Sequence, residues 1–294
     1  LYLIIYAKIN DMKKKLISIM ACPKCSSSLI LQAVSKTKTR IHTGKLLCKK
    51  CNNEFEIIDD IVCFKSITQK DRNRAESRRM INTFLKQEFK KDWIKRFLKK
   101  EFNFVKDEWK WMINNLNLRK SKIHLDWATG TGRFLRNILS IIRGEIIALE
   151  TDYATCVWLK LFLKKLKKYS RATIICGDAR NMPFRSNSIG SISSWHGLDE
   201  PKMDKVIDES KRVLKKSKRL ALSGVFYEKN SKSLKLARKW EIRFAQESQI
   251  YKYFQKLDFK DIKYKIFFKA KWSDRKSFLP RFEDYYSSYA ISAK

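Results

Sequence analysis

The feature that most constrains the fold is an apolar segment, residues 123–125, that runs into an acidic residue and a glycine loop. Asp126 ends the segment, Gly130 and Gly132 follow at a two-residue spacing, and a helix is expected to open at Arg133. Glycines allow a sharp turn and a close approach of a ligand to the main chain. A helix N-terminus adds free N–H donors beside the ligand. The segment therefore predicts a nucleotide-type cofactor site at the carboxyl end of a first strand.

The glycine spacing separates two classes of cofactor. A dinucleotide site usually has a third glycine three residues after the second, and Leu135 stands at that position here. Asp126, four residues before Gly130, suits a ligand with an ammonium group, because a carboxylate can hold it electrostatically. At these residues the chain resembles the class I S-adenosylmethionine-dependent methyltransferases, whose first motif is D-x-x-x-G-x-G.

The resemblance continues downstream in the order of that family. Glu150 ends a second apolar segment, Asp178 and Ala179 follow a third, and residues 212–215 match the family's R-V-L-K. It implies that Asp126, Gly130 and Gly132 hold the methionine end of the cofactor. It also implies that Glu150 holds the ribose, and that Asp178 faces the adenine with Ala179 alongside. The implied fold is α/β, with a Rossmann-like seven-stranded sheet sandwiched by helices over residues 119–294.

The glycine-loop motif does not specify the roles of two further residues that we expect near the methyl acceptor. Trp127 is large for the residue after the motif acid, and we expect it to reshape the floor of the pocket. His196 follows the fourth predicted strand, where this family meets its substrate. It is our candidate catalytic residue, either as a general base or as a donor to the acceptor. A hydrogen-bonded structural histidine is the alternative.

Four cysteines form two C-x2-C pairs near the start of the chain: Cys22, Cys25, Cys48 and Cys51. Each pair makes a tight knuckle, and two knuckles complete a tetrahedral four-thiolate site. We predict a structural zinc in a small ribbon domain over residues 20–65, with a rubredoxin-like iron or two disulfides as alternatives. An intracellular chain makes disulfides the weaker alternative. The other three cysteines are expected to be plain buried residues.

Residues 66–118 are predicted to form a basic helical connector, with aromatic residues at helical spacing that favour a core over nucleotide stacking. Phe89, Trp93 and Phe97 lie on one face of such a helix. The apolar run 154–166 predicts a helix on the sheet, with Lys160 on its wet face. Residues 1–19 precede a methionine close to the first cysteine, and we treat them as an uncertain extension.

The net charge of the chain does not identify the methyl acceptor. With 65 Lys and Arg against 30 Asp and Glu, the formal net charge is +35, which would concentrate RNA at the surface. The same composition also arises from a genome-wide bias. We therefore expect methyl transfer to RNA, with a small-molecule acceptor and a non-catalytic RNA-binding or partner protein as alternatives. No segment predicts a membrane span, so a cytoplasmic protein is expected, and the oligomeric state is left open.

Overall fold

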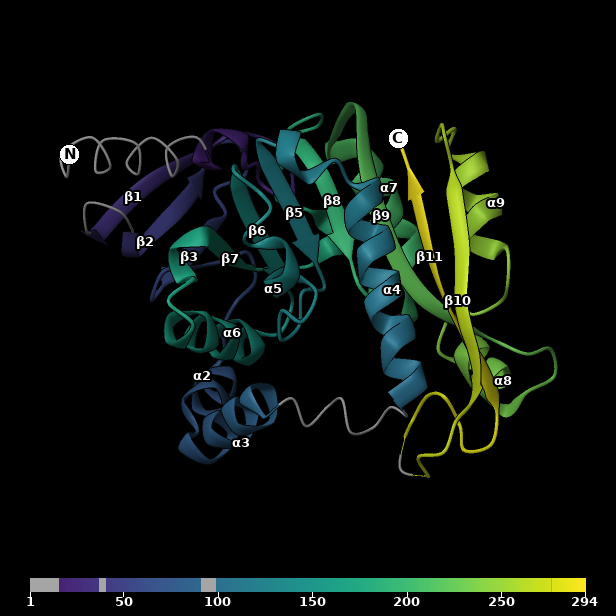
Figure 1. The fold of residues 1–294 in the computed structure, drawn as a ribbon. Coiled ribbons are helices and arrows are strands. Elements are labelled where there is room, and N and C mark those ends of the chain that lie inside the picture. Colours follow the sequence, from purple (N-terminus) through teal and green to yellow (C-terminus); the bar gives the residue numbers. More distant parts are fainter. Residues whose placement is uncertain (1–15, 37–40, 91–98, 276) are drawn as a thin grey trace.

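The structure is a computed structural model that describes residues 16–36, 41–90, 99–275 and 277–294. It contains one continuous mixed sheet that runs across the whole molecule (Figure 1). The strands are β1 Leu29–Lys36, β2 Ile41–Cys48, β3 Glu54–Ile58, β4 Ile61–Cys63, β5 Ile123–Trp127, β6 Glu145–Glu150, β7 Ala172–Cys176, β8 Ile189–Ser194, β9 Leu214–Tyr227, β10 Lys263–Lys271 and β11 Tyr285–Ala293.

The expected α/β fold is confirmed, but the predicted count of seven strands is wrong. The sheet has 11 strands in the order β1-β2-β3-β4-β7-β6-β5-β8-β9-β11-β10. The last seven in this order form the predicted sheet, with β5 to β9 parallel and β11 antiparallel to both neighbours. The first four strands come from the cysteine-bearing head, and they extend the same sheet instead of forming a separate one.

The head joins the sheet through a short parallel pairing. Val62 lies opposite Ile175, and Cys63 lies opposite Cys176. The backbone pairing is reinforced by a shared core, since Leu46 and Phe55 of the head belong to the same buried cluster as the sheet. A free edge of β7 would expose unpaired backbone groups, and the head covers that edge.

Helices cover both faces of the sheet, as the alternation along the strands requires. On one face, Ile146 and Ala148 meet α4, α5 and α6; on the other, Ile147 meets the layer that contains α7 and α9. The helices are α2 Gln69–Glu76, α3 Arg78–Phe89, α4 Lys99–Asn115, α5 Leu135–Ile138, α6 Tyr153–Lys165, α7 Met203–Val213, α8 Lys232–Lys239 and α9 Gln249–Lys256.

The prediction that Lys160 lies on the wet face of its helix is wrong. Only 2% of its side chain is exposed. Its ammonium lies 2.7 Å from Oδ1 of Asp59 and 3.9 Å from Oδ2 of Asp60, at the turn between β3 and β4. The apolar periodicity of α6 could not reveal this role, because the two carboxylates come from about 100 residues earlier in the chain and reach Lys160 only once the head has docked.

The predicted connector does more than link two domains. Helices α2 and α3 pack on α6, where the indole N–H of Trp158 donates to the carbonyl of Ala75 at 3.1 Å. Helix α4 lies along β9, β10 and β11 instead. Phe84 is buried against Trp158, as a core aromatic should be. Phe89 contacts the ring of Phe162 at 4.8 Å but is 47% exposed, so it is not a core residue in this structure. Trp93 and Phe97 lie outside the described residues. Among the helices that the structure describes, none combines the length and apolarity needed to cross a membrane.

Candidate functional site

The glycine loop lies at the carboxyl ends of four neighbouring parallel strands, in the order β7-β6-β5-β8. Gly130 has φ +53°, and a Cβ added to it would meet no atom within 4 Å. Gly132 has φ +75°, and its added Cβ would lie 2.7 Å from a methyl carbon of Leu159. Gly132 therefore has a backbone conformation that favours glycine and packs closely on Leu159 of α6, while Gly130 presents its backbone to open space.

Ala128 is a site residue that the sequence analysis did not single out. Its φ is 49°, in the left-handed region, which costs a residue with a Cβ about 1 kcal/mol. It lies in the turn that brings the loop back over β5 and lines the cavity described below. The only signal in the sequence is its small side chain between the motif acid and the first glycine.

Asp126 is buried at the end of β5, with 2% of its surface exposed. Ser193 of β8 donates its hydroxyl to Oδ1 at 2.5 Å. Burial raises the pKa of Asp126 to about 7, because it penalises the charged form, while the Ser193 hydrogen bond opposes the shift. A cationic ligand beside this carboxyl would restore its charge.

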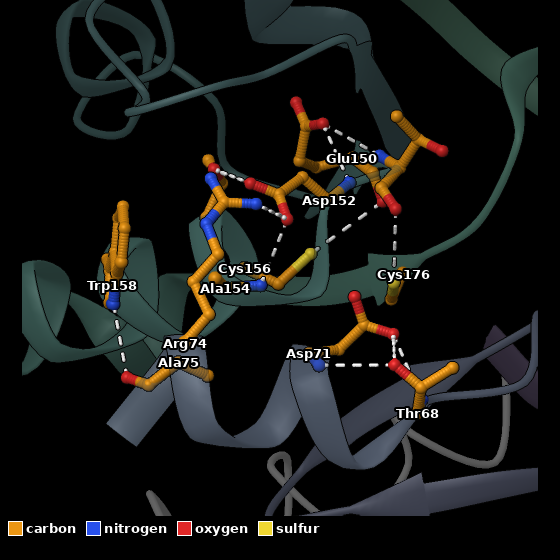
Figure 2. A network of polar contacts seen from close by, with 12 residues as sticks. Thr68, Asp71, Arg74, Ala75, Glu150, Asp152, Ala154, Cys156, Trp158 and Cys176 are labelled. Atoms are coloured by element: carbon orange, nitrogen blue, oxygen red, sulfur yellow. Dashed lines mark hydrogen bonds and ion pairs between the residues drawn. The ribbon is translucent and has the colours of Figure 1, made fainter. Parts of the chain in front are cut away.

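Glu150 ties the end of β6 to the glycine loop. Its Oε2 accepts from the N–H of Gly130 at 2.8 Å, and its Oε1 accepts from the N–H groups of Thr151 and Asp152. Asp152 in turn caps α6 and pairs with Arg74 of α2 at 3.0 Å (Figure 2). The predicted ribose-binding carboxylate is thus braced by the connector helix.

Asp178 and Ala179 follow β7, two strands away from β5. Asp178 accepts from the backbone N–H of Arg180 and forms an ion pair with its guanidinium at 2.8 Å. Burial opposes ionisation of Asp178, but the Arg180 contacts outweigh it and lower the pKa of the carboxyl. Both predicted adenine-side residues therefore stand at the same edge of the sheet as Glu150, outside the main cavity.

His196 lies in the segment that follows β8, on the other side of β5 from Glu150 and Asp178. Its Nδ1 is 3.0 Å from Oδ2 of Asp199, and its Nε2 is 3.8 Å from a carboxylate oxygen of Glu108 on α4. Burial disfavours the imidazolium, but the two carboxylates outweigh burial and raise the pKa of His196 to about 10. A histidine that is already protonated at neutral pH can donate hydrogen bonds, but it cannot act as a general base.

Glu108 was missed by the sequence analysis. It is fully buried, and it also accepts from the indole N–H of Trp195 at 3.3 Å. Its only sequence signal is an acidic residue among the aromatics of a helix. Trp127 does not form the pocket floor as expected. It is buried under the next loop, where a Cβ on Gly197 would lie 2.4 Å from its ring.

A cavity of about 770 Å³ lies beside the glycine loop and His196. One side is the glycine loop with Asp126, Gly130 and Arg133; the other is built from segments after β8, from β9 and from the β10–β11 connection. His196 belongs to the second side, in the segment after β8. Of the predicted cofactor residues, Asp126 and Gly130 line the cavity, and Glu150 reaches it through its bond to Gly130.

The four predicted metal ligands come together in the head. Their sulfurs lie within 4.8 Å of one another, with Cys22 to Cys51 at 3.5 Å and Cys25 to Cys48 at 3.4 Å. All four are free thiols. Tetrahedral zinc–thiolate bonds of about 2.3 Å place sulfurs about 3.8 Å apart, whereas a disulfide requires about 2.05 Å. The spacing is close to that of a tetrahedral four-thiolate site, and no disulfide joins these four cysteines in this structure.

An outer contact orients one of these thiols. The amide of Asn53 donates to the sulfur of Cys51 at 3.0 Å and accepts from the ammonium of Lys24 at 2.6 Å. Hydrogen bonds of this kind stabilise a thiolate and fix its direction. The cluster therefore has both the donor set and the supporting contact of a four-thiolate metal site.

Comparisons with known proteins agree with this geometry. Residues 125–217 match a family model described as a methyltransferase domain. A Bacillus halodurans C-125 protein, provisionally named a methyltransferase, is 15% identical with a TM-score of 0.52, covering 64% of this chain and 98% of that one. No curated protein matches the sequence.

Two further solved structures carry named substrates. Phosphoethanolamine N-methyltransferase 2 of Haemonchus contortus, with S-adenosylmethionine bound, is 15% identical with a TM-score of 0.53, covering 78% of this chain and 60% of that one. Geranyl diphosphate C-methyltransferase of Streptomyces coelicolor is 10% identical with a TM-score of 0.50, covering 64% of this chain and 77% of that one. At these identities the likeness shows the fold. With the family match, it supports an enzyme of the class I S-adenosylmethionine-dependent type.

Proposed function

We propose that this chain transfers a methyl group from S-adenosylmethionine to a small molecule bound in the cavity, and that the head holds a structural zinc. The observation that carries the proposal is the position of Asp126 and Gly130 at one side of the cavity, with Glu150 bound to the N–H of Gly130. The other side of the cavity leaves room for an acceptor. In this arrangement the cofactor and the acceptor meet beside His196.

Each of the predicted cofactor residues has a distinct role in the proposal. The Asp126 carboxylate holds the ammonium of the methionine end, and the open face of Gly130 admits it to the main chain. Glu150 exchanges its bond to Gly130 for the ribose hydroxyls, with Gly132 keeping the loop packed on α6. Asp178 accepts from the adenine amino group, with the backbone of Ala179 alongside.

The cofactor supplies an activated methyl group, so the protein contributes mainly position and orientation. His196 keeps its Nδ1–H on Asp199, and it donates toward the acceptor from Nε2, which lies 3.8 Å from Glu108. Its charge is balanced by those two carboxylates, which keeps it protonated during the reaction.

A small acceptor is favoured over RNA by where the charge lies. A hollow lined by Lys120, Lys218, Arg219, Lys263 and Lys294 is strongly basic. It also includes Ser121 and Gly190, which mark the amino ends of β5 and β8, whereas the cavity lies at the carboxyl ends. RNA bound in this hollow would lie at the amino ends of the strands, on the far side of the sheet from the cavity at their carboxyl ends. Phosphoethanolamine and geranyl diphosphate, the named substrates of the two structural neighbours, are small molecules. RNA methylation, which rests on the +35 charge, is the second candidate.

The cofactor assignment is tested by calorimetry with S-adenosylhomocysteine. The parent protein should bind it, and Glu150→Gln should weaken binding by about 1.5–3 kcal/mol, because a charged acceptor is lost. Glu54→Gln is the matched control, since Glu54 pairs with Lys45 on the exposed surface of the head and lies outside the cavity. No binding by the parent, or equal affinities in the parent and Glu150→Gln, would overturn the assignment.

The acceptor class is tested separately. Protein is incubated with labelled S-adenosylmethionine and a cell extract, which is then divided into RNA and small-molecule fractions. Label in the small-molecule fraction is the expected result. Label confined to RNA would establish the second candidate in place of the first.

A further inference from the structure

The acceptor side of the cavity is lined by aromatic rings to an unusual degree. Six of its lining residues are Trp195, Tyr227, Trp240, Trp272, Phe278 and Tyr286. Two pairs meet edge to face: Trp240 with Phe278 at 5.2 Å and 85°, and Trp272 with Tyr286 at 5.3 Å and 84°. Rings at such angles present both faces and edges to a ligand, and the faces carry partial negative charge.

The charged groups of the cavity have the opposite sign to the protein as a whole. Asp126, Asp199 and Glu200 line it against Arg133 and His196. Both cations are already engaged: Arg133 with Glu88 at 2.9 Å, and His196 with Asp199. A chain of net charge +35 thus surrounds a chamber in which carboxylates outnumber cationic groups.

Glu200 is the carboxylate of this set that remains available. Within the described residues it has no ion-pair partner, and it stands next to Asp199 on the acceptor side. Burial raises the pKa of Glu200, and the neighbouring Asp199 adds to the shift. A carboxylate with a raised pKa is a better proton acceptor than an ordinary surface glutamate.

We propose that the acceptor is an amine-bearing small molecule, recognised as its ammonium form by the rings of Trp240 and Trp272 and by Glu200. The inference rests on the proposed methyltransferase function and narrows its substrate class. A cation over an indole face is attracted by the ring quadrupole, and this attraction persists at rings that are partly exposed to solvent, as Trp240 is. Phosphate or carboxylate groups would instead meet the carboxylates and the negative ring faces.

The chemical step balances with the groups present. The ammonium first gives one N–H proton to the Glu200 carboxylate, which frees the nitrogen lone pair. That lone pair forms a bond to the sulfonium methyl carbon as the carbon–sulfur bond breaks, and its electron pair stays on sulfur as a thioether. The product is a methylated ammonium, and Glu200 returns its proton to water when the product leaves.

The inference can be tested without knowing the natural acceptor. Choline and its uncharged carbon isostere, 3,3-dimethylbutan-1-ol (dimethylbutanol), have nearly the same shape and differ in one positive charge. Their affinities are measured by ligand-observed NMR titration on the full chain with saturating S-adenosylhomocysteine. We expect choline to bind at least tenfold more tightly than dimethylbutanol, and inorganic phosphate not to compete with it.

Surface variants separate the ring from the charge. Trp240 is 51% exposed, so its replacement should not disturb folding. Trp240→Leu should weaken choline binding several-fold and leave dimethylbutanol unchanged, while Trp240→Phe retains most of the preference. Glu200→Gln should also weaken choline selectively.

Two failures of the experiment are distinguishable. If S-adenosylhomocysteine does not bind the parent chain, the methyltransferase proposal fails. If it binds but dimethylbutanol matches choline, or phosphate displaces choline, the amine assignment alone is wrong.

Discussion

The head and the catalytic edge lie in one sheet but are specified in different ways. In the head, four sulfurs from two short knuckles meet within 4.8 Å, and all the chemistry lies in segments of four residues. At the catalytic edge, Asp126, Glu150 and His196 come from three separate strand ends, and each is held by groups from elsewhere in the chain. The ligands of the first site come from two short segments of the chain, whereas the second site forms when the sheet does.

This difference predicts what each region loses when one of its site residues is replaced. A metal site carries its folding energy in a few bonds, so losing one ligand removes most of it. A strand-end site rests on a large buried core, which includes Leu125, Ile147 and Ile192. Losing one polar group there should change binding or local stability and leave the sheet intact.

The largest effect is expected from breaking the four-cysteine cluster. Cys48→Ser removes a thiolate from a site whose binding free energy is on the order of 10 kcal/mol in isolated zinc modules. The variant should lose its metal by elemental analysis and lose the head's structure by circular dichroism. Cys63→Ala, a buried thiol outside the cluster, is the control and should keep both. If Cys48→Ser and Cys63→Ala contain equal amounts of metal, the four-cysteine cluster is not a metal site.

The next prediction concerns the junction between the two regions. Lys160→Met removes the ammonium that contacts Asp59 and the buried Asp60, and leaves Asp60 with the imidazole of His42 at 3.4 Å. It should therefore cost about 1–3 kcal/mol of unfolding free energy, less than the loss of the sole partner of a buried charge. Lys164→Met, one turn further along α6 and exposed, should change stability by less than about 0.5 kcal/mol. Urea unfolding of both variants measures the difference. If the two match, the Lys160 ion pairs do not fasten the head.

Sequence patterns predicted the local parts of both regions. The C-x2-C spacing grouped the four sulfurs, and the apolar segment that runs into Asp126 predicted that Gly130 and Gly132 follow the end of a strand, β5. The partners that lie far away in the chain could not be predicted. Glu108 and the pairing of β4 with β7 depend on how the connector and head fold back on the sheet. No periodicity within a single segment records such a contact.

The catalytic edge should respond to pH through Asp126. With a pKa of about 7, raised by burial, its carboxyl is protonated in the folded chain at pH 6 and charged at pH 8. Its contribution to stability is therefore present at low pH and is lost as the pH rises through 7. An ammonium ligand needs the charged form, so affinity for S-adenosylhomocysteine should rise about tenfold from pH 6 to pH 8.

Asp126→Asn serves as the control for that titration. The variant should bind weakly at both pH values, because an amide does not titrate. His196, with a pKa of about 10, should not contribute over this range. A parent affinity that is flat between pH 6 and pH 8 would mean that Asp126 is not paired with the ammonium.

The smallest effect distinguishes backbone strain from packing at the catalytic edge. Ala128→Gly removes the Cβ from a residue at φ 49°, which relieves about 1 kcal/mol of native strain. The greater freedom of glycine in the unfolded chain offsets roughly 0.5 kcal/mol of this, so a small net stabilisation is expected by urea unfolding. Ala148→Gly, fully buried within β6, has no such strain and should be destabilising. If Ala128→Gly is destabilised as much as Ala148→Gly, the loop turn is held by its side-chain contacts and carries no strain.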